Sequence, residues 1–179
     1  MTIMFTLSII IAVGCILIFI ISTYNRFQDY IIRINEAEVS IDSVLRKRFD
    51  LLSKSIGVIK ANTDIEGDVL EIIAKLRSKK LDNFELDRGL YEAINEFNTY
   101  KENYENLRNC ESYMMIEINL IESESEIVAL RKYYNDIITD YNKMVKSCPS
   151  NFVALLKKYK TKAYFDGNSI ETDNETIRL

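Results

Sequence analysis

The sequence has no histidine, only one proline and only five glycines, each standing alone, in 179 residues. Without histidine it lacks the commonest general base, the commonest metal ligand and the Glu-x-x-His pairs of di-iron helical bundles. Isolated glycines cannot form the glycine-rich loop that cradles phosphate. So few turn residues also argue against a fold of many short strands. The sequence therefore predicts a helical protein that is not an enzyme and that binds neither a metal nor a cofactor.

An excess of one charge is also lacking, because acidic and basic residues are interspersed and the net charge is only −4. A nucleic-acid-binding surface would show as a basic face, so we expect no nucleic-acid partner. The cysteines, Cys15, Cys110 and Cys148, have neither metal-ligand spacing nor a disulfide pattern. They are interpreted as ordinary packing or surface thiols.

A long apolar run opens the chain, with no charged residue from Met1 to Asn25. As a helix, residues 3–21 are roughly 28 Å long, which matches a hydrocarbon layer of about 30 Å. A cleaved signal peptide would have a basic start and a shorter apolar stretch. A faint lipoprotein-like box ends at Cys15, but the apolar run continues beyond it. We therefore predict a transmembrane anchor over residues 1–23.

The basic residues Arg26 and Arg33 follow this anchor, and no basic residue precedes it. Positively charged residues flanking a span favour the cytoplasmic side. The sequence thus predicts a single-pass protein of the cell membrane, with its N-terminus outside and the rest of the chain in the cytoplasm.

Helical periodicity follows the anchor. No proline or glycine interrupts the chain between Thr23 and Ile56, so the membrane helix is expected to continue into the first soluble helix. Thr63 to Glu66 forms a capping box and predicts the start of a second helix, and Asp82 with Glu85 predicts the start of a third.

The last helix carries a heptad seam from Tyr113 to Cys148 and should end before Pro149. The predicted fold class is all-α: a single N-terminal transmembrane helix that continues into an antiparallel up-down-up-down four-helix bundle. The bundle is expected over residues 24–148.

Charged and polar residues within these helices leave alternatives open. Glu38 and Arg48 fall in the apolar stripe of the first helix. They lie either at its edge with their charges in water, or in a buried ionic contact that fixes the register of the bundle. For the basic cluster Arg46, Lys47 and Arg48 we expect ion pairing within the bundle.

In the last helix, Tyr134 and Tyr141 fall in the seam and are expected in the core. Asn135 and Asn142 lie beside it and are placed for hydrogen bonds between helices.

Residues 149–165 mix lysines with apolar and aromatic residues. Because the fourth helix of such a bundle returns to the membrane, this segment fits an interfacial element beside anionic lipid. The alternative is that its apolar residues close the end of the bundle. The candidate membrane-interface residues are Phe152, Leu156, Lys157, Lys158, Lys160, Lys162, Tyr164 and Phe165. Residues 166–179 are polar and mostly acidic, and are predicted to be a disordered tail.

Motifs of the first and last helices resemble those of the LemA family. They are Glu36-Ala37, Ile41-Asp42 and the run from Leu45 to Leu51 in the first helix, and Arg131 to Asn135, Asp140-Tyr141-Asn142 and Pro149-Ser150-Asn151 at the end of the bundle. The resemblance implies a membrane helix, a cytoplasmic four-helix bundle and no assigned enzymatic activity. The candidate structural or interaction residues are Glu38, Arg46, Arg48, Asp50, Arg131, Tyr134, Asn135, Tyr141, Asn142 and Pro149.

Anchor, seam and missing chemistry together favour a membrane-anchored scaffold or adaptor, with membrane organisation as one role. It would present its bundle to a protein partner or to copies of itself. The alternative is a sensor or regulatory subunit of a membrane complex that binds a small ligand or lipid in a polar pocket, for which Glu38 and Arg48 are the candidates.

Overall fold

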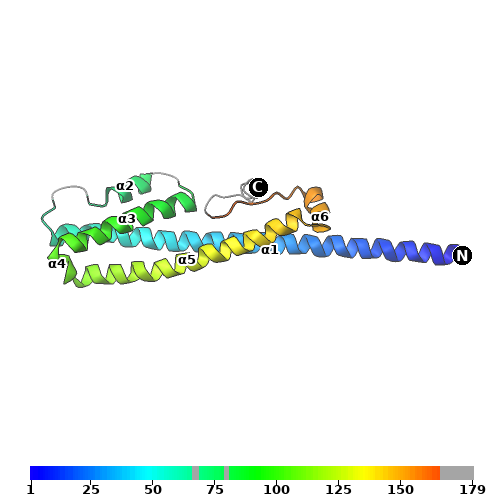
Figure 1. Cartoon of the computed structure of the whole chain (residues 1–179), viewed down its shortest axis with the longest axis horizontal. Coiled ribbons are helices and arrows are strands. Elements are labelled where there is room, and N and C mark those ends of the chain that lie inside the picture. Colours follow the sequence, from blue (N-terminus) through cyan, green and yellow to red (C-terminus); the bar gives the residue numbers. More distant parts are fainter. Residues whose placement is uncertain (66–68, 79–80, 166–179) are drawn as a thin grey trace, which may run out of the picture. The chain divides into compact units, whose positions relative to one another are not determined.

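The structure, a computed structural model, describes residues 1–65, 69–78 and 81–165 (Figure 1). The predicted tail 166–179 lies outside these residues. The helices are α1 (Thr2–Asn62), α2 (Glu71–Ser78), α3 (Asn83–Asn103), α4 (Glu105–Arg108), α5 (Glu111–Lys146) and α6 (Ser150–Lys157). No strand occurs in the described ranges, so the all-α prediction is confirmed. Two compact units divide the chain. The first unit comprises residues 1–36 and 134–179, and the second unit comprises residues 37–133.

Helix α1 is unbroken over 61 residues, as the absence of proline and the wide spacing of glycine predicted. Its N-terminal part is long and apolar enough to cross a membrane, with a mean hydropathy of 3.0 over its most apolar window. The apolar side chains of this part are exposed in the folded chain, whereas those further along α1, such as Leu45 and Leu52, are fully buried. One helix therefore joins a candidate membrane span to a packed core.

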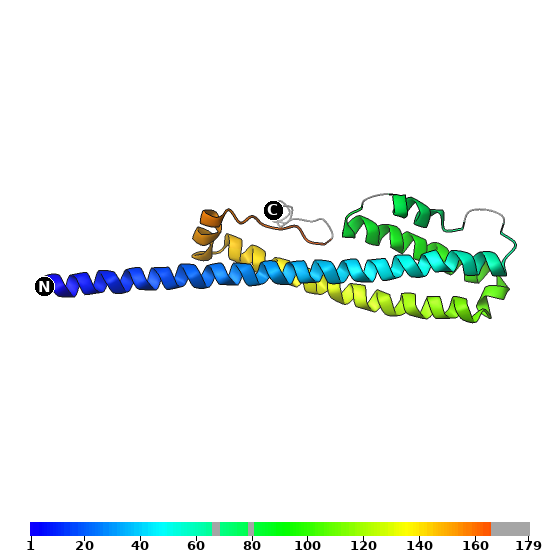
Figure 2. The same cartoon turned by 180° about the vertical axis from the view of Figure 1, so that it is seen from behind.

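The second unit is built on the later part of α1, with α2, α3, α4 and α5 up to Tyr133. Figure 2 shows α2 lying on the outer side of α3. Helix α3 begins where the sequence predicted, because the Asp82 carboxylate accepts a hydrogen bond from the Glu85 N–H at 2.8 Å. The core of the second unit is made of apolar side chains from α1, α3 and α5: Leu45, Leu52, Ile59, Leu90, Ala93, Phe97, Tyr113, Leu120 and Ile127.

The second helix differs from the prediction. Thr63 lies in a bend, and its hydroxyl donates to the Ile59 carbonyl at 2.8 Å, so Thr63 ends α1 instead of starting a helix. Glu66 of the predicted capping box lies outside the described residues. Helix α2 begins only at Glu71 and has 8 residues. Because α2 makes about two turns, it covers part of α3 and is shorter than a member of the expected four-helix bundle.

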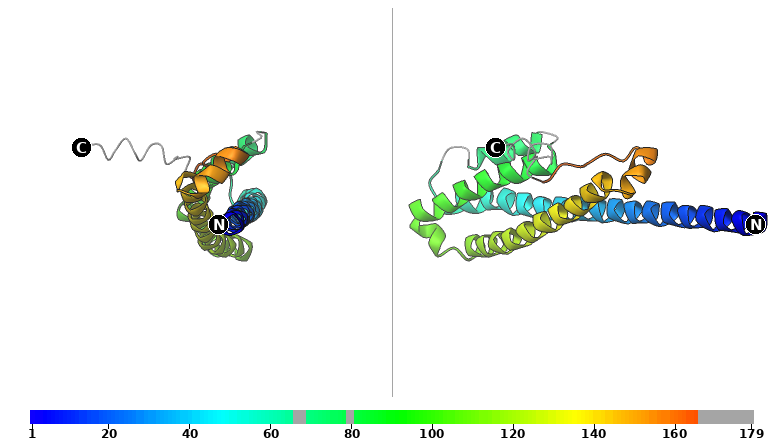
Figure 3. Two further views of the ribbon diagram at one scale, coloured as in Figure 1. Left: turned by 90° about the vertical axis from the view of Figure 1, so that its right-hand side faces the viewer. Right: turned by 45° about the vertical axis from the view of Figure 1, so that its right-hand side comes forward.

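The first unit contains α1 up to Glu36, α5 from Tyr134, α6 and the extended residues that follow α6. Figure 3 shows α6 directly after the end of α5. Pro149 stands at the N-cap of α6, three residues after α5 ends at Lys146, and the Ser150 hydroxyl donates to the Met144 carbonyl at 2.7 Å. The proline thus lies just beyond the end of α5, as predicted, and is the last residue of the turn before α6.

Candidate functional site

Arg48 is the centre of a buried charge cluster in the second unit. Its side chain is charged but occupies a position in the apolar stripe of α1, and it is only 1% exposed. The guanidinium pairs with Glu124 of α5, and its Nη1 lies 3.5 Å from Asp87 Oδ1 of α3. Asp87 also pairs with Arg131 of α5. Two positive and two negative side chains from three helices therefore pair with one another. Arg48 and Asp87 are buried, whereas the side chains of Arg131 and Glu124 are 30% and 45% exposed, so opposite charges compensate the two that lie away from water.

Hydrogen bonding within this cluster is incomplete. Arg48 Nε and Nη1 and Asp87 Oδ1 are buried and have no hydrogen-bond partner among the described residues. The contact between Arg48 and Asp87 is thus an ion pair without hydrogen-bond geometry. The two buried members, Arg48 and Asp87, each have two charged partners, so removing either one leaves the other with a single partner.

Of the two placements that the sequence left open for Arg48, the stripe edge and a buried ionic contact, the structure has the second. Arg48 does not lie at the stripe edge with its charge in water; it forms the buried ionic contact, and its partners come from α3 and α5. Glu38 is half-buried, and its backbone carbonyl accepts a hydrogen bond from Asn83 at 3.2 Å. The partners of Arg48 lie 39 and 76 positions away in sequence, so no local pattern could identify them.

The rest of the basic cluster also pairs within the second unit. Arg46 donates to Asp42 at 2.7 Å, and this hydrogen bond raises the pKa of the Arg46 guanidinium. Lys47 lies 4.0 Å from Glu126 of α5. Asp50 is exposed on α1, and its charge adds to the raised pKa of Arg46. All three bases therefore have acidic partners. Arg46 pairs within its own helix, and Lys47 and Arg48 pair with other helices of the second unit.

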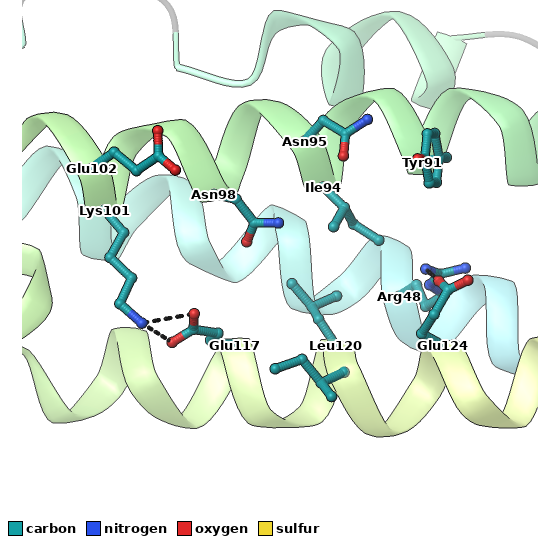
Figure 4. Close-up of a pocket in the computed structure, with 11 residues that line it drawn as sticks. Arg48, Tyr91, Ile94, Asn95, Asn98, Lys101, Glu102, Glu117, Leu120 and Glu124 are labelled. Carbon is teal, nitrogen blue, oxygen red and sulfur yellow. Dashed lines mark hydrogen bonds and ion pairs between the residues drawn. The ribbon is translucent and has the colours of Figure 1, made fainter.

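A groove of about 460 Å³ runs between α3 and α5 beside the cluster (Figure 4). At one end Arg48 meets Glu124, and at the other the Lys101 ammonium donates to both oxygens of Glu117, at 2.7 and 2.6 Å. Its lining residues are Arg48, Tyr91, Ile94, Asn95, Asn98, Lys101, Glu102, Glu117, Leu120, Ile121 and Glu124. Apolar walls between two ionic ends suit either an elongated apolar ligand or the side chains of a partner helix.

Sequence reasoning missed a second apolar face on α5. The predicted seam is buried at Tyr113, Ile116, Leu120, Ser123 and Ile127. A parallel stripe, offset from this seam, is exposed to solvent. Its members and their exposed fractions are Met114 39%, Ile118 52%, Ile121 63% and Val128 53%. The gaps of four, three and seven residues repeat the spacing of the buried seam, so the signal was present in the sequence. We call these four residues the α5 stripe.

Asparagines of the last-helix motif act in the first unit. Asn142 is fully buried; its Oδ1 accepts from the Lys162 N–H and its Nδ2 donates to the Lys162 carbonyl, both at 2.8 Å. Asn135 Oδ1 accepts from the Phe165 N–H at 2.8 Å. Between them, Thr139 Oγ1 lies 3.2 Å from the Tyr164 hydroxyl. The prediction that Asn135 and Asn142 form hydrogen bonds between helices is wrong. Both amides bind the main chain of the extended segment after α6 instead.

Tyrosines complete this unit. Tyr141 is 3% exposed and packs edge-on against Phe27 of α1, with ring centroids 5.9 Å apart, and burial raises its pKa. Tyr134 is half-buried, short of the full burial its seam position predicted, and meets Phe165 edge-on at 6.2 Å. Tyr159 stacks at a tilt on Phe27 at 4.8 Å. The aromatic rings therefore hold α1, α5 and the segment after α6 together.

These contacts divide the candidate membrane-interface residues. Lys162, Tyr164 and Phe165 are fastened along α5 by their backbone or rings and are half-buried. Their place at a membrane interface stays a prediction. The residues that remain exposed are Phe152, Leu156, Lys157, Lys158 and Lys160.

Among the residues that the structure describes, no group of three cysteine, aspartate or glutamate side chains is arranged to hold a metal ion. The second unit thus carries a groove, an exposed apolar stripe and a cluster of paired charges.

Comparison with known proteins agrees with the motifs that make these contacts. No curated protein matches the chain. A family model described as the LemA family matches residues 37–178, which is most of the chain. Within that range lie Arg48 and Arg131 of the charge cluster and Asn135 and Asn142 of the first unit. The chain belongs to the LemA family.

Proposed function

We propose that this LemA-family protein is a non-enzymatic, membrane-anchored helical scaffold or adaptor. The apolar part of α1 would anchor it in the cell membrane, and the second unit would present α5 to a helix of a protein partner or of a second copy. Arg26 and Arg33, which follow the apolar run, support a cytoplasmic placement of this unit. A role in membrane organisation is compatible with such an anchor.

The observation that carries the proposal is the α5 stripe. Its four side chains are between 39% and 63% exposed, and their three-and-four spacing is what a second helix needs in order to pack along α5. An isolated exposed apolar residue is ordinary on a protein surface, but an aligned set on one helix is typical of an interaction site. The groove between α3 and α5 shares Ile121 with this stripe, which extends the apolar surface sideways.

Charges beside the stripe indicate the chemistry of the partner. Glu111 and Glu122 are exposed on α5 next to the apolar positions. Charges flanking a helical seam select partners of the opposite sign. The acidic flank favours a partner helix bordered by lysine or arginine. Lys132 is also exposed, one turn beyond Val128, so an antiparallel second copy would supply such a charge opposite Glu111.

Photocrosslinking in intact membranes tests this proposal. A photoreactive phenylalanine analogue at Ile118 should trap one recurring protein, because Ile118 lies in the middle of the stripe. The matched control position is Val39 on α1, which is 69% exposed and outside the stripe. Introducing Met114→Glu and Ile121→Glu should abolish the adduct at position 118, while circular dichroism should remain unchanged because both residues are exposed.

Each outcome discriminates. Equal labelling from positions 118 and 39, or an adduct that survives both glutamates, would contradict a partner site on the stripe. Adducts only between copies of the chain would replace the adaptor with a self-assembling scaffold.

A second candidate function, a sensor or regulatory subunit, is favoured by the groove itself. Its volume of about 460 Å³ suits a small molecule or one lipid chain, and Asn95 and Asn98 offer hydrogen bonds along its wall. Native mass spectrometry of the full chain, with Ile94→Trp to fill the groove, tests it. A small molecule retained by the natural chain and lost from the variant would support a sensor, and none bound to either would count against one.

A further inference from the structure

Helix α6 of the first unit has one buried face and one exposed apolar face. Val153 and Ala154 are each 2% exposed, so they close the end of the first unit. Phe152, Leu155 and Leu156 are 67%, 80% and 70% exposed. The two sequence-based alternatives for this segment therefore apply to opposite faces of one short helix, and the outward face has no covering within the described chain.

Contacts of α6 place it at the end of the apolar run of α1. The Lys157 ammonium lies 5.1 Å from the centroid of the Tyr24 ring. The Tyr159 hydroxyl, just after α6, accepts a hydrogen bond from Gln28 at 2.7 Å. Tyr24 is next to the last uncharged residue of the N-terminal run, and Arg26 follows it. Where an apolar run of this length ends, the headgroup region begins, and tyrosine is enriched at that depth.

The sequence around α6 is rich in lysine, and one of these lysines, Lys143, pairs with Asp140 at 3.7 Å. The 25 residues from 141 to 165 contain six lysines and no aspartate or glutamate. Lys143, Lys146, Lys157, Lys158 and Lys160 are exposed. Lys158 also ends α6 in the left-handed conformation (φ 58°), with its N–H directed to the carbonyls of Ala154 and Leu155, so the chain turns back to α5 immediately after the helix.

We infer that α6 lies in the headgroup region of the same membrane that α1 crosses. Phe152, Leu155 and Leu156 contact the upper part of the acyl chains, and the surrounding lysines contact anionic headgroups. An exposed apolar face bordered by lysines is what binding at an anionic interface requires. The inference rests on the membrane anchoring proposed above, but not on the α5 stripe.

Tryptophan fluorescence tests this placement, because the natural chain has no tryptophan. The full chain carrying Phe152→Trp is reconstituted into vesicles of phosphatidylcholine and phosphatidylglycerol, with and without bromine high on the acyl chains. The emission of Trp at position 152 should be blue-shifted relative to that of the control Ile32→Trp. Brominated lipid should also quench the emission at position 152 several-fold more than the emission at position 32. Ile32 is 55% exposed on α1 and lies about two turns beyond Tyr24.

A third variant, Leu17→Trp, reports on the anchor alone. Quenching of this reporter without quenching of Phe152→Trp would overturn the inference while leaving the anchor in place, and the α6 face would then belong to a protein partner. No quenching of either reporter would overturn the anchoring and the inference together.

The choice of anionic lipid has its own test. Adding Lys157→Glu, Lys158→Glu and Lys160→Glu to the Phe152→Trp chain should reduce quenching in vesicles that contain phosphatidylglycerol. In vesicles of phosphatidylcholine alone, the same substitutions should have much less effect. Equal effects in both kinds of vesicle would overturn the assignment to anionic headgroups.

Discussion

The two units are fastened by opposite chemistry. In the first unit, neutral amides and tyrosine rings hold an extended segment to α5, and both polar ends of the Asn142 amide are hydrogen-bonded. In the second unit, four charged side chains join three helices, and several of their buried atoms have no hydrogen bond in the described part of the chain. Removing one neutral hydrogen bond weakens only the attachment of the segment that it held. A buried ion pair such as Arg48–Asp87 is costly to break from one side, because the remaining charge stays away from water with fewer partners.

The largest expected effect comes from breaking the charge balance. Arg48→Ala removes the central cation and leaves Asp87 and Glu124 facing each other, with Asp87 buried. Breaking a buried pair from one side costs about 3–5 kcal/mol, and Arg131 remains as a partner of Asp87, so we expect a loss of about 3 kcal/mol. Urea unfolding of the full chain in detergent micelles, followed by circular dichroism, measures it.

Two controls accompany this variant. Arg46→Ala removes an exposed arginine from the same helix and should leave the free energy of unfolding almost unchanged. Combining Arg48→Met with Asp87→Leu should recover most of the loss, since apolar residues of similar size replace a buried ion pair well. If Arg48→Ala unfolded no more easily than Arg46→Ala, the second unit would not depend on its charges.

An intermediate effect is expected in the first unit. Asn142→Ala removes two hydrogen bonds to Lys162, each contributing about 1 kcal/mol, so the extended segment should lose about 2 kcal/mol of its attachment. Trypsin should then cut faster after Lys160 and Lys162, with little change in helix content. The control Asn119→Ala removes only a bond to the Met115 carbonyl of its own helix. Equal cleavage rates in the two variants would show that the segment is held by other contacts.

The smallest effect tests how α2 packs on α3. A Cβ on Gly89 would lie 2.5 Å from Leu76 Cδ2, whereas one on Gly57 would meet nothing within 4 Å. Gly57→Ala should stabilise α1 by about 0.5–1 kcal/mol, because glycine weakens a helix interior. Gly89→Ala should fall short of that gain by about 1 kcal/mol, because Leu76 must move. Adding Leu76→Ala should remove this difference; otherwise α2 does not pack as described.

Sequence periodicity was a good guide to the helices. Long α1, the buried seam of α5 and the Asp82 cap of α3 depend on neighbours within a few residues, and all three were predictable. The late start of α2 was not predictable. The Thr63 hydroxyl donates to the Ile59 carbonyl of α1, and this bond takes the place of the capping bond that the sequence predicted. The partners of Arg48 and Asn142 were also hidden, because they are tertiary contacts across many residues and the segment after α6 carries no periodic signal.

The amides of α5 have a consequence for how this family can change over time. Asn142 and Asn135 bind the N–H and carbonyl groups of Lys162 and Phe165, not their side chains. Every residue except proline supplies these groups. The side chain of Lys162 makes neither of its bonds to Asn142, so replacing this lysine by any residue except proline should leave both bonds in place. Asn135 and Asn142 bind the backbone of the segment, so substitution of these two asparagines should be tolerated least.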